Sequence, residues 1–221
     1  MKSVRIWDLP TRLFHWALVL CVSISVVSAK LGGNAMEWHM RCGYTVLALL
    51  AFRILWGIVG GRWSRFSSFV RGPATLTRYL RGELQAGEHA GHNPLGAFSV
   101  LLMLLWLLAQ VATGLVADDE IATTGPLVRF VSGKLSSLAT GWHAGPGQWG
   151  LYALIALHIG AIVFYAARKG DKLVTPMFSG DKRLAGEVAA TRDDWATRVF
   201  ALTVLAACAA AVYLLVSLGD G

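Results

Sequence analysis

Five apolar stretches, each about 20 residues long, constrain the fold of this chain more than any other feature of its sequence. They cover approximately residues 12–31, 40–60, 95–117, 147–167 and 196–218. A helix of about 20 residues crosses the hydrocarbon core of a bilayer, and lipid offers no hydrogen-bond partner to an unpaired backbone group. The chain is 55% hydrophobic and only 15% charged, which is too apolar for an ordinary soluble domain. The sequence therefore predicts an all-α integral membrane protein with five transmembrane helices.

The first apolar stretch has some features of a cleaved signal peptide. Lys2, Arg5 and Arg12 precede it, and the small residues VVSA lie near its end. However, His15 and Trp16 interrupt the segment that a signal peptide keeps apolar, and four further spans follow. We therefore expect this stretch to be a retained helix.

Most of the 20 lysines and arginines fall on one side of the predicted spans. They precede the first span, occupy the connection between the second and third, and lie between the fourth and fifth. Because cytoplasmic loops are enriched in these residues, we expect a multi-pass protein of the bacterial cytoplasmic (inner) membrane, with a cytoplasmic N-terminus and an external C-terminus. This topology explains the net charge of +7, so we infer no nucleic-acid partner.

The cytoplasmic connection Gly60–Asn93 mixes arginines with aromatic residues in RWSRFSSFVRGPATLTRYLRG. That mixture is typical of a segment at the level of the lipid headgroups. We expect membrane lipid to be its partner, as a lipid-anchored linker rather than a binding site. His89 and His92 lie near its end, where solvation is easy, and we interpret both as structural.

Four of the six histidines lie within or at the edge of a predicted span: His15, His39, His143 and His158. At about 1.5 Å of rise per residue, His15 and His158 fall toward the inner ends of their spans, and the other two fall at the outer ends. A lone histidine on an apolar face is usually a packed residue. Two pairs at matched depths indicate function, because imidazoles inside a bilayer are costly and facing helices of a bundle commonly build cofactor sites.

Haem held by two imidazoles fits these pairs better than the alternatives. Iron with two histidine ligands has no open position, which suits electron transfer. Zinc fits less well because each pair supplies only two ligands, and a proton relay generally adds carboxylates, which the predicted spans lack. The chain has no C-x-x-C-H motif, which excludes covalent haem attachment.

Arg53 follows His39 by 14 residues and shares its helical face near the inner end of the second span. A buried guanidinium needs an anion, which haem propionates would supply, but snorkelling to the cytoplasmic headgroups explains the residue equally well. Gly43 and Gly160, beside His39 and His158, would admit a flat macrocycle or mediate helix packing.

Several motifs, in this order, resemble the bacterial dihaem cytochrome b-561 family, and within it the cytochrome b subunits of nickel-iron hydrogenases and their stand-alone relatives. They are WDLPTRLFHW, HMRCGYTVLALLAFRILWG, GHNPLGAF, TGLVADD, GPL and LHIGAIVFYAARKGDKLVTPMFSG. The resemblance implies a four-helix transmembrane bundle over residues 1–183 that binds two haem b groups through the four histidines, which match the family's ligand positions. Residues 184–221 would add a fifth, C-terminal transmembrane helix that packs outside this core.

The resemblance also implies electron transfer in a respiratory chain, between the quinone pool and a periplasmic partner that is either a c-type cytochrome or a hydrogenase. The sequence contains no independent quinone motif, so any quinone site is inherited from the resemblance. A stand-alone oxidoreductase acting on superoxide or quinone is an alternative with the same fold, and a non-redox membrane anchor is another. Whether the protein is an enzyme stays open.

One departure from the family concerns the outer end of the fourth span. The family often has glutamate directly after this histidine, whereas the chain reads HAGPGQ from His143. We therefore expect the fourth helix to begin near Pro146 and to leave His143 on a turn.

Overall fold

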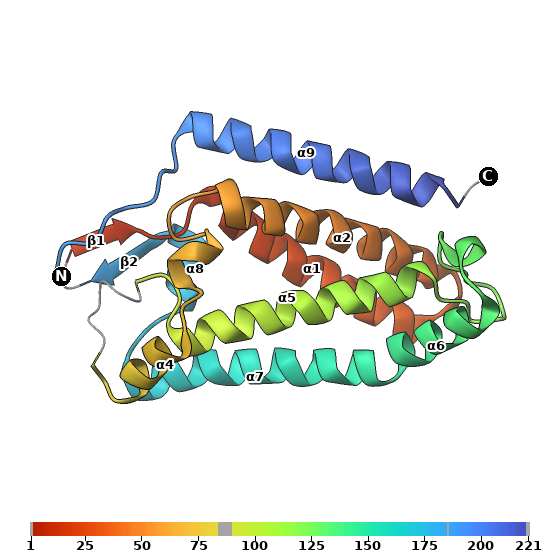
Figure 1. The fold of residues 1–221 in the computed structure, drawn as a ribbon, viewed down its shortest axis with the longest axis horizontal. Coiled ribbons are helices and arrows are strands. Elements are labelled where there is room, and N and C mark those ends of the chain that lie inside the picture. Colours follow the sequence, from red (N-terminus) through yellow and green to blue (C-terminus); the bar gives the residue numbers. More distant parts are fainter. Residues whose placement is uncertain (1, 84–89, 185, 220–221) are drawn as a thin grey trace. The chain divides into compact units, whose positions relative to one another are not determined.

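Five long helices dominate the computed structural model, which describes residues 2–83, 90–184 and 186–219 (Figure 1). They are α1 (Leu9–Leu31), α2 (Met36–Val59), α5 (Pro94–Leu115), α7 (Pro146–Lys169) and α9 (Trp195–Ser217). All five are long and apolar enough to cross a membrane. They coincide with the five predicted spans to within a few residues, which confirms the predicted all-α integral membrane fold.

Shorter elements connect the long helices. They are β1 (Lys2–Arg5), the 3-10 turn η1 (Gly33–Ala35), α3 (Phe66–Phe69), α4 (Pro73–Leu80), the 3-10 turn η3 (Val128–Phe130), α6 (Gly133–Ala144), α8 (Val174–Ser179) and β2 (Asp181–Leu184). β1 and β2 pair antiparallel, with Lys2 opposite Leu184 and Arg5 opposite Asp181. The sequence did not predict this sheet, because strands of four residues are too short to show a clear alternation of apolar and polar side chains.

Side-chain caps fix where two of the long helices begin. The Thr11 amide donates to Asp8 Oδ1 at 2.8 Å, and the Gly96 amide donates to Asn93 Oδ1 at 2.7 Å. Each cap satisfies an amide that has no partner within its own helix. Pro94 follows the second cap at the first helical position, where its missing N–H costs nothing.

The chain forms two compact units, each assembled from three segments. The first unit comprises Met1–His15, Arg53–Leu102 and Leu157–Val204, and the second comprises Trp16–Phe52, Met103–Ala156 and Leu205–Gly221. His15, Arg53 and His158 therefore belong to the first unit, whereas His39 and His143 belong to the second. Each pair of histidines predicted from depth falls within a single unit.

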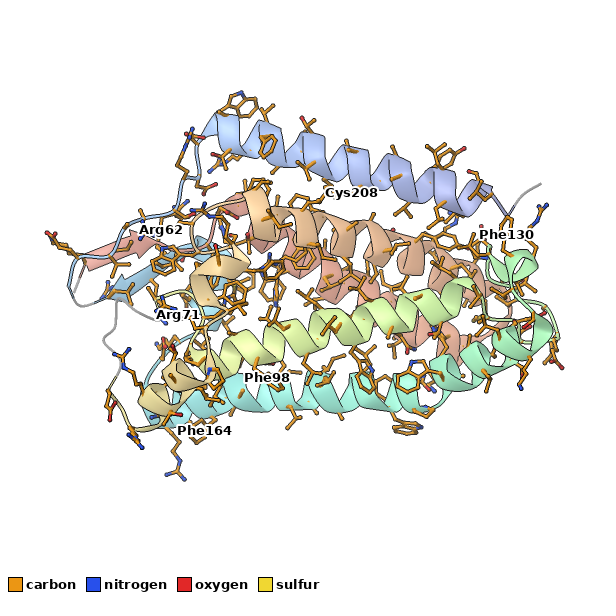
Figure 2. All side chains as sticks on the ribbon, in the orientation of Figure 1. Arg62, Arg71, Phe98, Phe130, Phe164 and Cys208 are labelled. Carbon is orange, nitrogen blue, oxygen red and sulfur yellow. The ribbon has the colours of Figure 1, made fainter. Side chains whose placement is uncertain are left out.

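Part of the connection after α2 folds inward in the first unit, so the prediction of a lipid-anchored linker is wrong for Trp63 and Phe69. Trp63 and Phe69 are only 6% and 4% exposed, and the Trp63 indole donates to the Ala189 carbonyl at 2.9 Å. Trp63 packs in an apolar cluster with residues that include Ile6, Trp7 and Leu184. The arginines of the connection stay exposed, and Figure 2 labels Arg62 and Arg71 among them.

The long helices present apolar side chains on their outer surfaces, as a bilayer requires. Phe98 on α5 and Phe164 on α7, labelled in Figure 2, are 68% and 52% exposed. On α9, Cys208 is buried while Leu202 and Tyr213 are exposed. Such surfaces are stable in lipid, whose hydrocarbon tails are as apolar as the side chains themselves.

The carboxylate of Asp193 joins the start of α9 to the N-terminal segment within the first unit. It accepts hydrogen bonds from Arg5 Nη1 at 2.6 Å, the Leu9 amide at 3.1 Å and Arg198 Nε at 3.1 Å. Its side chain is only 5% exposed. Burial opposes ionisation, but the bonds from Arg198, Leu9 and Arg5 outweigh it and lower the pKa of Asp193. The fifth helix is therefore fastened to the first turn of α1, a role that the sequence did not reveal.

We expect Asp193→Ala to destabilise the protein by about 2–3 kcal/mol, because it removes a buried acceptor that takes three hydrogen bonds, two of them from charged arginines. Thermal unfolding of the purified protein in detergent measures this as a lower midpoint temperature. Since the folded pKa lies below the ordinary value of about 4, the stabilisation is present at neutral pH and is lost as the pH falls through the folded pKa.

Glu37→Ala is the matched control, because Glu37 pairs with Arg41 at a site where both side chains are more than half exposed. Exposed pairs of this kind contribute less than about 1 kcal/mol. Equal midpoints for Asp193→Ala and Glu37→Ala would contradict the fastening role.

Candidate functional site

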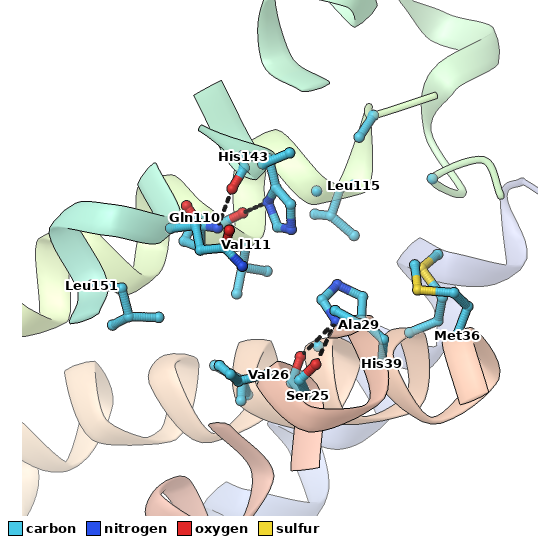
Figure 3. Close-up of a pocket in the computed structure, with 18 of the residues that line it drawn as sticks. Ser25, Val26, Ala29, Met36, His39, Gln110, Val111, Leu115, His143 and Leu151 are labelled. Atoms are coloured by element: carbon cyan, nitrogen blue, oxygen red, sulfur yellow. Dashed lines mark hydrogen bonds between the residues drawn. The ribbon is translucent and has the colours of Figure 1, made fainter. Parts of the chain in front are cut away.

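The structure places the four membrane histidines in two facing pairs. In the second unit, His39 in the first turn of α2 faces His143 at the end of α6, with ring centres 5.8 Å apart and planes at 89° (Figure 3). In the first unit, His15 on α1 faces His158 on α7, with ring centres 6.5 Å apart and planes at 49°. We call these the outer pair and the inner pair.

The structure confirms one part of the prediction drawn from the HAGPGQ sequence, the start of the fourth long helix, and contradicts the other, the position of His143 on a turn. α7 does begin at Pro146, as expected. However, His143 lies in the last turn of the separate helix α6 rather than on a turn, so that expectation is wrong. Ser132 starts this helix, since its hydroxyl accepts from the Leu135 amide at 3.3 Å. Gly145 then separates α6 from α7.

A cavity of about 400 Å³ adjoins the outer pair. Its wall includes both imidazoles together with apolar side chains such as Val26 and Leu151 (Figure 3). Gly43 also lines it, and a Cβ atom at Gly43 would meet no other atom within 4 Å. The glycine therefore faces open space, and it makes no close helix contact.

Backbone carbonyls fix the orientation of both outer imidazoles. His39 Nδ1 lies 2.9 Å from the Ser25 carbonyl oxygen, and His143 Nδ1 lies 2.7 Å from the Gln110 carbonyl oxygen. A carbonyl only accepts hydrogen bonds, so each Nδ1 carries the proton and each Nε2 keeps a free lone pair. Metal-ligating histidines are characteristically held in this way, with the second nitrogen donating to a carbonyl or carboxylate.

Two residues of α5, Gln110 and Gly114, determine where the His143 side chain can lie. The Gln110 side-chain amide donates a hydrogen bond to the His143 carbonyl at 2.7 Å. Together with the bond from His143 Nδ1 to the Gln110 carbonyl, it gives these two residues a reciprocal pair of hydrogen bonds. A Cβ atom at Gly114 would lie 2.8 Å from His143 Cε1, so only glycine leaves room for the ring. We did not predict either residue, although a polar amide within a strongly apolar span is itself a signal of function.

The spacing of both pairs fits one metal ion between two imidazoles. A metal–nitrogen bond of about 2 Å places the ring centre about 3 Å from the metal. Two rings on opposite sides of one metal therefore have centres about 6 Å apart, close to the observed 5.8 and 6.5 Å. No group of three or more His, Cys, Asp or Glu side chains that could hold a metal forms among the described residues. Two imidazoles are too few for zinc but suffice for a metal that a macrocycle already holds.

Arg53 lies inside the first unit and does not extend to the headgroups. The residue is 3% exposed, and its guanidinium carbon is 4.9 Å from the ring centre of Phe66. Within the described part of the chain, its Nη1 has no hydrogen-bond partner. A buried guanidinium without an anion is costly, so this site fits a ligand that brings a carboxylate.

His92 is half-buried and its Nδ1 is shut off from solvent, contrary to the prediction that solvation is easy there, whereas His89 lies outside the described residues. The His92 ring contacts Trp7 and Phe69, with ring centres 4.7 and 4.6 Å away. Burial, together with the positive charges of Arg53 and Lys182, lowers the pKa of His92 to about 3. The ring is therefore neutral at physiological pH.

Comparisons with known proteins agree with this geometry. The family described as prokaryotic cytochrome b561 matches residues 6–180. The chain is 23% identical to the probable Ni/Fe-hydrogenase 1 B-type cytochrome subunit of Escherichia coli K12, over 80% of this chain and 90% of that protein. It is 25% identical to the probable Ni/Fe-hydrogenase B-type cytochrome subunit of Rhodobacter capsulatus, over 81% of each. No solved structure matches the chain significantly.

The family match covers most of the chain and includes all four membrane histidines. Its b-type cytochrome relatives imply haem b as the cofactor, and the ring spacings above are compatible with it. The chain therefore belongs to the prokaryotic cytochrome b561 family, and it is a membrane b-type cytochrome of electron transfer.

Proposed function

We propose that this protein binds two haem b groups and passes electrons across the bacterial cytoplasmic membrane, between the quinone pool and a periplasmic redox partner. The observation that carries the proposal is the meeting of four membrane histidines as two facing pairs. His15 and His158 would hold the inner haem, and His39 and His143 the outer haem. Bound haem b supplies a one-electron iron couple.

The residues of the chain orient and enclose these cofactors. Ser25 and Gln110 keep Nε2 of the outer imidazoles free for iron, and two imidazole ligands leave no open position for oxygen chemistry. Arg53 would bind a propionate of the inner haem, since its side chain is buried and its Nη1 has no hydrogen-bond partner among the described residues. In this proposal residues 1–183 form the haem-binding domain, and residues 184–221 add the fifth helix.

The periplasmic partner is a hydrogenase or a c-type cytochrome. We favour the hydrogenase because the two related proteins described above are named as probable cytochrome subunits of Ni/Fe hydrogenases.

Spectroscopy of the purified protein followed by reconstitution tests this function. We expect two haem b groups per chain by haemochrome assay, and both should be reduced by quinol in liposomes. An added hydrogenase with hydrogen, or a c-type cytochrome, should then exchange electrons with them from the outer side. Absence of reducible haem would identify a non-redox anchor, and reduction by superoxide alone would favour the stand-alone oxidoreductase.

The proposed orientation has its own test. Alkaline phosphatase fused in the loop before α2, at Gly32, or after the end of α9 should be active, because both places would be periplasmic. The same reporter fused at Arg71 should be inactive, because the arginines there would keep the connection in the cytoplasm. The reverse pattern would invert the topology, and an inactive fusion after α9 alone would remove α9 from the set of spanning helices.

A further inference from the structure

His92 has a buried nitrogen that the proposed ligand set does not use. The residue lies in the segment that leads into α5, and its ring is held between Trp7 and Phe69. Its Nδ1 is shut off from solvent and has no hydrogen-bond partner among the described residues. Leaving such an atom unpaired costs about 1–3 kcal/mol, so we infer a partner from outside the described residues.

Arg53 shares this feature and is linked to His92 through aromatic rings. Its guanidinium lies over Phe66, whose ring centre is 5.8 Å from that of Phe69. Phe69 in turn contacts His92 at 4.6 Å. Arg53 Nη1 is likewise buried and unpaired within the described part of the chain. Two unpaired polar atoms, one on a permanent cation, therefore occur in one connected set of side chains.

Two acids of the first unit, Asp8 and Asp171, have hydrogen-bond or ion-pair partners other than Arg53 and His92 among the described residues. The Asp8 carboxylate accepts from the Thr11 amide and the Ser64 hydroxyl, at 2.8 and 2.9 Å. Asp171 pairs with Lys182 at 3.0 Å. No hydrogen bond or ion pair joins Arg53 to an acid among the described residues, and its buried Nη1 is unpaired there, so this atom can accept an anion as its partner.

The inner pair belongs to the same unit as this set. His15, His158, His92 and Arg53 all lie in the first unit, and the charge of His158 contributes, after burial and the charges of Arg53 and Lys182, to lowering the pKa of His92. A ligand of the inner pair that carries a carboxylate would therefore bind in the unit that holds both unpaired atoms.

We propose that His92 Nδ1 and the Arg53 guanidinium together bind one carboxylate, a propionate of the haem held by His15 and His158. This proposal rests on the proposed function, and it adds His92 as a second propionate-binding residue. Nδ1–H donates to one carboxylate oxygen, and the guanidinium donates to the same group. A neutral ligand such as a quinone carbonyl would satisfy His92 but would give the Arg53 guanidinium no hydrogen-bonded anion.

The test compares His92→Leu with His92→Asn in the purified holoprotein. Leucine removes the donor, whereas asparagine keeps an N–H near the position of Nδ1. Losing the donor leaves more negative charge beside the inner haem and favours the ferric state. We expect the ferrous-to-ferric ratio of the inner haem at a fixed potential to fall threefold to tenfold in His92→Leu, a shift of about 30–60 mV. His92→Asn should restore most of it.

Three further measurements make the test specific. Arg53→Leu should shift the same haem in the same direction, whereas Arg71→Leu, which removes an exposed arginine of the connection, should not. The propionate bending band in resonance Raman spectra should move in His92→Leu and return in His92→Asn. The outer haem serves as the internal reference, and its potential should stay constant in every variant.

Several outcomes would overturn the proposal. One is an unchanged potential of the inner haem in His92→Leu. Another is an equal shift in the leucine and asparagine variants. A third is an unchanged potential of the inner haem in His92→Leu together with a changed response to quinone analogues. The last result would mean that His92 binds a neutral carbonyl. Failure of the proposed function is distinguishable, because it would appear as unchanged haem content in His15→Ala, whatever happens at His92.

Discussion

His15→Ala and His158→Ala are each expected to remove the same one of two haem components, and His39→Ala and His143→Ala the other. The reason is geometric, since an iron held by two imidazoles needs both rings at about 6 Å between centres, and the observed pairs meet this condition at 6.5 and 5.8 Å. Each variant should therefore lose about half of its haem b. Redox-titrated optical spectra and electron paramagnetic resonance distinguish the two components.

The double variants provide the internal control for this prediction. His15→Ala combined with His158→Ala should look like either single variant, whereas His15→Ala combined with His39→Ala should lose both haems. If His15→Ala and His158→Ala removed different components, the pairing would be wrong. Full haem content in His143→Ala would place the outer ligand elsewhere.

Gly114→Ala is expected to weaken the outer haem site about tenfold or more. The new Cβ atom would lie 2.8 Å from His143 Cε1, closer than a Cβ atom normally approaches, and 3.2 Å from Nδ1, which is a tight contact. The ring cannot turn aside freely, because its Nδ1 is bonded to the Gln110 carbonyl at 2.7 Å. Disturbing the groups that orient a metal ligand typically costs 10–100-fold in affinity. Haem transfer to apomyoglobin measures the loss, and the inner haem should be retained.

Gly141→Ala is the matched control for this substitution. Gly141 lies on α6, the helix that carries His143, and a Cβ atom there meets nothing within 4 Å. Alanine stabilises a helix relative to glycine by about 1 kcal/mol, so a loss in Gly114→Ala cannot come from helix propensity. Equal haem retention in the two variants would show that His143 has more freedom than the structure indicates.

Much of this protein follows from local sequence patterns. The five apolar stretches determine the five spanning helices, because the length and hydropathy of a segment are enough to commit it to lipid. The depths of the four histidines follow from position along those helices. For Arg53 the sequence left two interpretations open, since the burial of a side chain depends on its neighbours in the fold and not on its position along one helix.

Only the tertiary structure decided which groups surround the histidines. The carbonyls of Ser25 and Gln110 come from neighbouring helices, 14 and 33 residues away along the chain. Asp193 meets Arg5 across 188 residues, and His92 is enclosed by Trp7 from the N-terminal segment and Phe69 from α3. Hydropathy and helical period describe a residue and its near neighbours, so they contain no information about such contacts. These arise only when distant segments pack and each buried polar group must find a partner.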